Sequence, residues 1–191
     1  KKQIYPTDKL EFILVNDHST DATLDLLEES KLDNLQIVNM PDGQFGKKNA
    51  IAKAVQIAKG KIIISSDADC SFSSNWVRTM VSYFSNSNIM LVSGPVFFHK
   101  QKGIFHSLQA LEFTSLIGSG AGAIGMGNAI FCNGANMAYR KSIFLEVNDF
   151  ATDRAVSGDD VFLLHSVKEK YPKSIAFAKN EDAIVTTKGA Q

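Results

Sequence analysis

Short apolar segments alternate with amphipathic segments along the chain, and this alternation predicts the fold class. The apolar segments are brief and rich in β-branched residues, which is typical of buried strands, and they cover residues 11–15, 35–38, 61–66, 89–92 and 137–140. Helical patterns lie between and after them, from a cap at 19–21 to about 29, and over 46–59, 75–84 and 159–170. Strands that alternate with helices predict βαβ units and a mostly parallel sheet flanked by helices, in an α/β domain.

The segment 113–139 contains no charged residue and is long enough to cross a bilayer. It also contains six glycines and three asparagines, which do not suit a single helix in lipid. We therefore expect this segment to pack against other structure or to line a pocket.

The composition is that of an ordinary globular protein, with 191 residues of which 45% are hydrophobic and 21% charged. Twenty basic residues balance twenty acidic ones, so nucleic-acid binding is not expected. Only two cysteines, Cys70 and Cys132, are present, which suits a reducing compartment better than a disulfide scaffold. Because the chain begins at Lys1, we expect residues 1–191 to form a single truncated domain of a longer protein.

Acidic side chains follow two of the predicted strands. Asp17 follows the strand at 11–15, whereas Asp67 and Asp69 follow the strand at 61–66. Ligands of open α/β sheets bind beyond the carboxyl ends of the strands. Asp67 and Asp69 point the same way and can share Mg²⁺ or Mn²⁺ with substrate phosphates. The alternatives are a helix cap with a turn residue for this pair and an Asx turn for Asp17.

Two further positions carry charge at the start of a predicted helix. Lys47 lies in the first turn of the helix at 46–59, where the helix dipole disfavours a cation, so we expect an anion nearby. Asp159 and Asp160 begin the helix at 159–170 and complement its dipole. If one of these carboxylates faces a pocket, it could also act as a general base.

One glycine pattern points to a different cofactor. Residues 120–125 satisfy the G-x-G-x-x-G pattern, and Glu146 follows about twenty residues later. That pattern belongs to the first βα turn of a dinucleotide-binding fold, whereas here it lies beyond the middle of the chain. We therefore do not expect a nicotinamide cofactor.

Taken together, the motifs resemble those of the family 2 glycosyltransferases with the GT-A fold. NDHSTD at 16–21 is similar to the family's DDGSxD motif, GKKNA at 46–50 to its GKxxAxN helix start, and SSDAD at 65–69 to its DxD loop. CNGANMAYR at 132–140 resembles the segment beneath the donor sugar and acceptor, and GDD at 158–160 occupies the place of the ED motif. Asn16 and Ala52 depart from the family pattern.

The resemblance implies a Rossmann-like GT-A domain that lacks the first strand of the fold. It also implies roles in donor binding. Asp17 is expected to hold the nucleobase, which would be uracil, and Lys47 to lie near the nucleotide. Asp67 and Asp69 are expected to hold a divalent metal, Mg²⁺ or Mn²⁺, with Asp67 also contacting the nucleotide-sugar.

For the reaction itself, the resemblance identifies Asp160 as the catalytic base, with Asp159 as the second candidate. Asn133 and Gly134 are expected to contact the nucleotide-sugar. The implied activity is inverting transfer of a sugar from a nucleoside-diphosphate sugar, most simply UDP-linked, to an acceptor hydroxyl.

The resemblance further implies a carbohydrate or lipid-linked acceptor and a role in cell-envelope or exopolysaccharide synthesis. It places the site in the cytoplasm at the inner face of the membrane, with membrane anchors outside these 191 residues. The alternatives are a non-catalytic nucleotide-sugar-binding domain and a sugar-1-phosphate nucleotidyltransferase. The latter would need a glycine-rich, arginine-containing loop after its first strand, which this sequence does not have.

Overall fold

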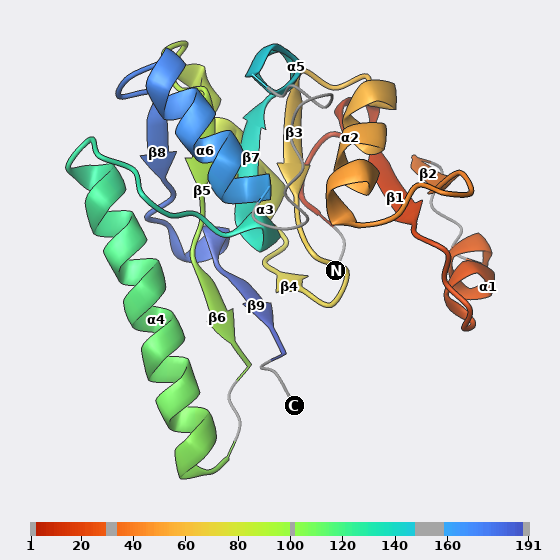
Figure 1. Cartoon of the computed structure of the whole chain (residues 1–191), viewed down its shortest axis with the longest axis horizontal. Helices are drawn as coiled ribbons and strands as arrows, with labels where there is room; N and C mark the ends of the chain where they lie inside the picture. Colours follow the sequence, from red (N-terminus) through yellow and green to blue (C-terminus); the bar gives the residue numbers. More distant parts are fainter. Residues whose placement is uncertain (1–2, 30–33, 100–101, 148–158, 189–191) are drawn as a thin grey trace.

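The computed structural model describes residues 3–29, 34–99, 102–147 and 159–188. Its strands are β1 Phe12–Asn16, β2 Leu35–Asn39, β3 Ile62–Ser65, β4 Ser71–Phe72, β5 Leu91–Ser93, β6 Val96–Phe98, β7 Met137–Arg140, β8 Ile175–Phe177 and β9 Val185–Thr187. Its α-helices are α1 Thr23–Glu28, α2 Lys47–Ile57, α3 Trp76–Ser82, α4 Ile104–Gly125, α5 Lys141–Val147 and α6 Asp159–Lys170. Short 3₁₀ turns are η1 Thr7–Lys9, η2 Tyr83–Ser85, η3 Gly134–Asn136 and η4 Glu181–Ala183. Helices flank the strands on both sides (Figure 1), as expected of an α/β domain.

The described strands form three sheets, in the orders β1-β2, β3-β7-β5-β8 and β4-β9-β6. The pairs β1·β2, β5·β8 and β6·β9 are parallel, whereas β3·β7, β5·β7 and β4·β9 are antiparallel. The expectation of a mostly parallel sheet was therefore wrong, because the sheets are mixed. In the central sheet the reason is β7, which follows the long helix α4 and lies between β3 and β5 in the opposite direction to both, and in the third sheet it is β4, which runs opposite to β9.

The buried core lies on both faces of the central sheet. In β5 and β7, alternate side chains face opposite ways, so Leu91 and Tyr139 join one cluster whereas Val92 and Ala138 join the other. The first cluster packs against α5 and α6, and the second packs against α3 and β9. All four of these side chains are at most 1% exposed. The central sheet is thus a rigid platform for the loops at its strand ends.

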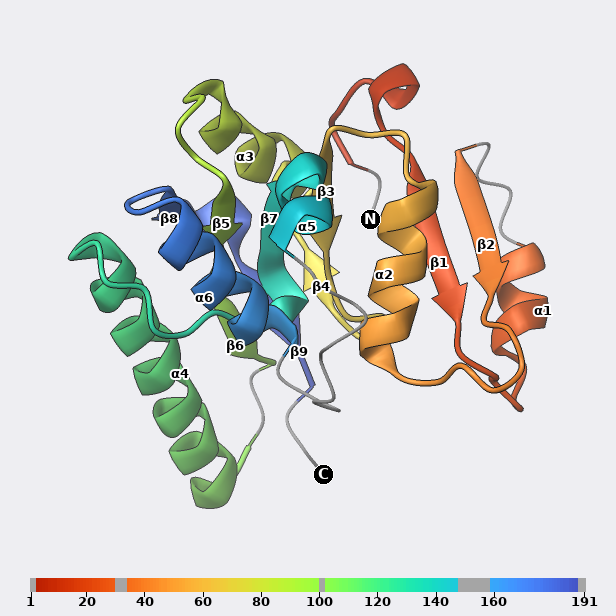
Figure 2. The ribbon, with the colours of Figure 1, turned by 45° about the horizontal axis from the view of Figure 1, so that its top comes forward.

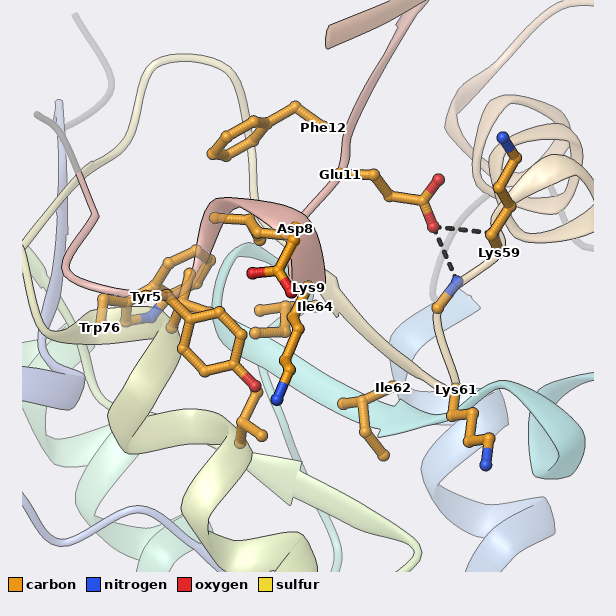
Figure 3. A pocket seen from close by; sticks show the side chains of 14 residues that line it. Tyr5, Asp8, Lys9, Glu11, Phe12, Lys59, Lys61, Ile62, Ile64 and Trp76 are labelled. Atoms are coloured by element: carbon orange, nitrogen blue, oxygen red, sulfur yellow. Dashed lines mark hydrogen bonds between the residues drawn. The ribbon is translucent and has the colours of Figure 1, made fainter. Parts of the chain in front are cut away.

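A groove of about 510 Å³ separates β1 from β3. Glu11, just before β1, accepts hydrogen bonds of 2.7 Å from the backbone amides of Lys59 and Gly60, just before β3 (Figure 3). Apolar side chains of both strands line the groove, among them Phe12 and Ile62. Among the described strands, β1 pairs only with β2 and β3 only with β7, so no backbone ladder crosses this groove.

The sheet of β1 and β2 lies at one end of the molecule and α4 at the other, with α2 between β1 and the central sheet (Figures 1 and 2). The helix α4 covers the first half of the uncharged segment and packs against β6 and β8. None of the helices in the described ranges has both the length and the apolar character required to cross a membrane.

The helix boundaries differ in detail from the predicted ones. The helix α2 ends at Ile57 with Ala58 as its C-cap, two residues before the end of the helix predicted at 46–59. The amide of Gly60 is held by the carboxylate of Glu11. The helices α4 and α5 were not predicted, nor were the strands β4, β6, β8 and β9, whose two or three residues show little period.

Candidate functional site

The N-terminus of α2 connects the loops that follow β1 and β3. The amide of Gly46 donates a hydrogen bond of 2.8 Å to Oδ2 of Asp17. The next residue, Lys47, places its Nζ 2.5 Å from Oδ1 of Asp67. The anion expected near Lys47 is therefore the carboxylate of Asp67. The two strand ends that were predicted to carry the site lie at one edge, on either side of α2.

The carboxylate of Asp17 is stabilised in its charged form. The Gly46 amide is the largest cause that lowers its pKa from the ordinary value of 3.8, and the hydrogen bond from His18 is the next. His18 has a positive φ of 59° and packs against Phe45, with ring centroids 4.4 Å apart and the ring planes tilted by 35°. Its Nε2 atom is buried without a hydrogen-bond partner. The sequence analysis did not single out His18 or Phe45 as neighbours of Asp17. The position of an aromatic residue directly before the GKK motif was a usable signal.

Asp69, the second of the two aspartates after β3, contacts a residue that lies 118 positions further along the chain. Thr187, the last residue of β9, donates a hydrogen bond of 3.0 Å from Oγ1 to Oδ2 of Asp69. The Sγ atom of Cys70 lies 3.8 Å from the other carboxylate oxygen. Burial raises the pKa of the Cys70 thiol, and both cysteines are free, so Cys70 is a neutral neighbour of the aspartates.

Asp160 lies at the start of α6 and faces the η3 turn. Its Oδ2 accepts a hydrogen bond of 2.7 Å from the amide of Gly134, and its Oδ1 accepts one of 2.9 Å from the amide of Val161. A Cβ atom on Gly134 would lie only 3.2 Å from Oδ2, so any other residue here would press on the carboxylate and shift it by a few tenths of an ångström. Each carboxylate oxygen has two lone pairs, so Asp160 can still accept a proton. Asp159 begins α6, but its side chain lies outside the described part of the structure.

The η3 turn links Asp160 to the end of β3. The hydroxyl of Ser65, the last residue of β3, donates a hydrogen bond of 3.2 Å to the carbonyl of Gly134. Asp67 follows Ser65 by two residues, so Gly134 and Asp160 lie beside the DxD loop. In the same turn, Oδ1 of Asn133 accepts a hydrogen bond of 2.9 Å from the amide of Ala135. The side chain of Asn133 therefore caps this turn, and its role toward a donor stays a prediction.

Asn136, the last residue of the η3 turn, holds this turn in place through its buried side chain, a role that the sequence did not predict. Its Oδ1 accepts a hydrogen bond of 3.0 Å from the indole of Trp76, and its Nδ2 donates to the carbonyls of Pro95 and Ala183. The residue is fully buried. Because three elements are tied to one amide, the position of the η3 turn is closely defined.

The residues present fit a metal that is shared with a substrate. Within the described residues, no three histidine, cysteine, aspartate or glutamate side chains converge as a metal site. Two carboxylates, Asp67 and Asp69, nevertheless follow β3 and remain accessible to solvent. Mg²⁺ is usually bound through one or two carboxylates together with substrate phosphates and water, and Mn²⁺ also prefers oxygen ligands. The donor set therefore suits such an ion only in company with a phosphate ligand.

Comparisons with known proteins agree on one family. The family model described as Glycosyl transferase family 2 matches residues 1–147. Glycosyltransferase AglE of Haloferax volcanii is 32% identical over 103 residues, which are 53% of this chain and 34% of that protein. The poly-beta-1,6-N-acetyl-D-glucosamine synthase of Staphylococcus aureus is 27% identical over 153 residues, which are 76% of this chain and 36% of that protein. The chain thus spans about a third of the length of these curated relatives.

Solved structures share the fold at low sequence identity. S. aureus TarS in complex with UDP-GlcNAc matches with a TM-score of 0.69 and 16% identity, over 99% of this chain and 52% of that chain. The glucosyl-3-phosphoglycerate synthase of Mycobacterium tuberculosis, solved with Mn²⁺, UDP and glucosyl-3-phosphoglycerate, matches with a TM-score of 0.61 and 16% identity, over 95% and 61% of the two chains. The GT-A fold predicted from the motifs is therefore confirmed.

Proposed function

Because the chain belongs to glycosyl transferase family 2, we propose that it forms most of the catalytic domain of an inverting glycosyltransferase. The enzyme would move a sugar from a UDP-sugar to an acceptor hydroxyl. The observation that carries this proposal is the arrangement of the acidic residues. Three aspartates lie at one edge of the sheets, namely Asp17 after β1, Asp67 after β3 and Asp160 at the start of α6. They are connected there by the contacts of Gly46, Lys47 and Gly134.

The donor would lie across the N-terminus of α2. Asp17 would accept hydrogen bonds from the uracil ring, and its lowered pKa keeps it an acceptor at neutral pH. Lys47 and the DxD loop would face the diphosphate, since they bring positive charge and metal-binding oxygens to the same place. TarS was solved with UDP-GlcNAc and the M. tuberculosis synthase with UDP, which supports a uridine nucleotide as the first choice.

In the chemical step, Asp160 would accept the proton of the acceptor hydroxyl. The acceptor oxygen then forms a bond to the anomeric carbon, on the face opposite the diphosphate. The bond from that carbon to the diphosphate oxygen breaks, its electron pair leaves with UDP, and the anomeric configuration inverts. The amide of Gly134 holds the Asp160 carboxylate in one orientation throughout. A divalent ion at Asp67 and Asp69 would offset the negative charge that develops on the departing diphosphate.

The setting of the reaction is proposed on the same basis. One relative is a poly-beta-1,6-N-acetyl-D-glucosamine synthase, which supports a carbohydrate or lipid-linked acceptor and a product of the cell envelope or an exopolysaccharide. We place the site in the cytoplasm, at the inner face of a membrane to which other parts of the protein are anchored.

The variant Asp160→Asn, made in the complete protein, tests this function. The amide keeps the shape but is a much poorer base, so transfer from UDP-GlcNAc or UDP-glucose should fall by about 10²–10⁴-fold. Binding of UDP, measured by calorimetry, should be retained. Glu169→Gln, an exposed change of the same kind on α6, is the control. Normal turnover by the Asp160 variant would overturn the assignment, and a wild-type protein that binds UDP-sugar without ever consuming it would be a non-catalytic binder.

A further inference from the structure

We propose that the Lys47 ammonium competes with the divalent cation for Asp67, and that the donor diphosphate ends this competition. This inference rests on the proposed function, because it assumes that Asp67 and Asp69 bind a metal with a nucleotide. It adds a second role for Lys47 as the cation that occupies the DxD motif in the absence of a donor. The metal and the donor would then bind cooperatively, each favouring the other.

The position of Lys47 is the first step of the argument. Lys47 is the first residue of α2. The N-cap residue of this helix is Gly46, which has no side chain to cap it. A cation gains nothing from the helix dipole at this end of a helix. The side chain nevertheless reaches across to the next strand end, where Nζ lies 2.5 Å from Oδ1 of Asp67. The ion pair with Asp67 therefore accounts for a charge that the helix itself does not favour.

The second step is the exclusion between two cations. Oδ1 of Asp67 is the oxygen that the ammonium contacts, and Oδ2 of Asp69 is bonded to Thr187. A metal that uses both aspartates must displace the ammonium or bind beside a like charge, and either reduces its affinity. The two carboxylates carry two negative charges, of which the ammonium neutralises one. A divalent ion alone therefore meets a site with half of its charge already balanced.

The third step is the release of Lys47. The Lys47 and Asp67 side chains are 56% and 41% exposed, so the pair is open to solvent. An exposed ion pair of this kind is weak and can be exchanged at little cost. A diphosphate placed at the DxD loop offers the ammonium a more highly charged partner close by. Lys47 then pairs with the phosphate oxygens, and Asp67 becomes free for the metal.

The test measures Mn²⁺ binding rather than turnover. Mn²⁺ is titrated into the complete protein, first without nucleotide and then with UDP. Electron paramagnetic resonance measures the concentration of Mn²⁺ that remains free. We expect Lys47→Met to bind Mn²⁺ about 2- to 5-fold more tightly than the wild type without UDP, as loss of an exposed ion pair allows. UDP should strengthen Mn²⁺ binding by a smaller factor in the same variant, because there is no Lys47–Asp67 ion pair for UDP to displace. The same factor should describe how Mn²⁺ strengthens UDP binding, because coupling between two ligands is reciprocal.

Two variants complete the test. Lys53→Met removes the same charge from the same helix, at a residue six positions further along, and should leave both constants at wild-type values. Lys47→Arg keeps the cation, so its Mn²⁺ affinity in the absence of UDP should equal that of the wild type. An unchanged or weaker Mn²⁺ affinity in Lys47→Met would refute the competition and leave the proposed function intact. Failure of the wild type to bind Mn²⁺ even with UDP would refute both this inference and the metal role of the DxD motif.

Discussion

The amide of Gly134 and the carboxylate of Asp160 form a hydrogen bond of 2.7 Å that joins the η3 turn to the start of α6. The two residues are 26 positions apart, and the absence of a side chain at 134 leaves room for their close contact. The bond fixes where the carboxylate points, and the hydrogen bond from Ser65 to the Gly134 carbonyl fixes the turn relative to β3. The orientation of the proposed base is thus set by backbone rather than by another side chain.

Gly134→Ala should displace the proposed base. The new Cβ would lie 3.2 Å from Oδ2 and 3.3 Å from Cβ of Asp160, so the carboxylate must move. A misplacement of about 1 Å can cost about 10²-fold in rate, and because the shift here is only a few tenths of an ångström we expect kcat to fall by a smaller factor, about 3- to 10-fold. Gly122→Ala, which meets open space on α4, is the matched control and should retain activity. Full activity in Gly134→Ala would show that the contact is not required.

Thr187→Val should weaken metal binding through Asp69. The substitution removes the 3.0 Å hydrogen bond to Oδ2 and leaves the shape of the side chain nearly unchanged. Groups that orient a metal ligand contribute about 10- to 100-fold in affinity, and we expect a loss toward the lower limit because Asp69 is exposed. The measurement is Mn²⁺ titration in the presence of UDP. Thr186→Val, one residue earlier in β9, should have no effect, and equal affinities for all three proteins would exclude the positioning role.

Asn136→Ala should destabilise the whole domain. It leaves the indole of Trp76 and the carbonyl of Ala183 without their hydrogen-bond partner in a fully buried site, whereas the carbonyl of Pro95 keeps the hydrogen bond from the amide of Val185. At about 1–3 kcal/mol for each of the two unsatisfied buried groups, we expect the free energy of unfolding to fall by roughly 2–6 kcal/mol in urea titrations. Asn133→Ala removes one capping bond and should cost only about 1 kcal/mol. Similar losses for the two variants would contradict this account.

The pKa of Asp17 predicts how the β1 loop responds to acid. The Gly46 amide and His18 lower the pKa of the folded state below the ordinary value of 3.8. The charged carboxylate therefore contributes stability above pH 3.8 that is lost as the pH falls through the lower, folded value. Carbon-detected NMR titration should find the Asp17 pKa below 3.8 in the wild type and closer to it in His18→Ala. An Asp17 carboxyl that titrates identically in both proteins would show that His18 does not stabilise the anion.

The sequence alone predicts the strand ends and the elements that follow them, because hydrophobic period and motif spacing are local properties. The unfavourable helix position of Lys47 even predicts an anion beside it, which is Asp67. The contact between Thr187 and Asp69 could not be predicted, since it spans 118 residues and depends on the pairing of β4 with β9. The antiparallel insertion of β7 was missed for the same reason, as strand direction depends on the path of the whole chain.

The groove between β1 and β3 divides the molecule into two units that should open separately. Among the described residues, no ladder of backbone hydrogen bonds joins these strands, and β1 and β2 are only partly buried, whereas β5 is fully buried. Amides of β1 and β2 should therefore exchange with solvent hydrogen well before those of β5. Asp17 belongs to the first unit, and Asp67 and Asp160 to the second. A bound nucleotide that spans them would slow exchange in β1 and β2, because it would add to the few contacts by which α2 and Glu11 already join the two units.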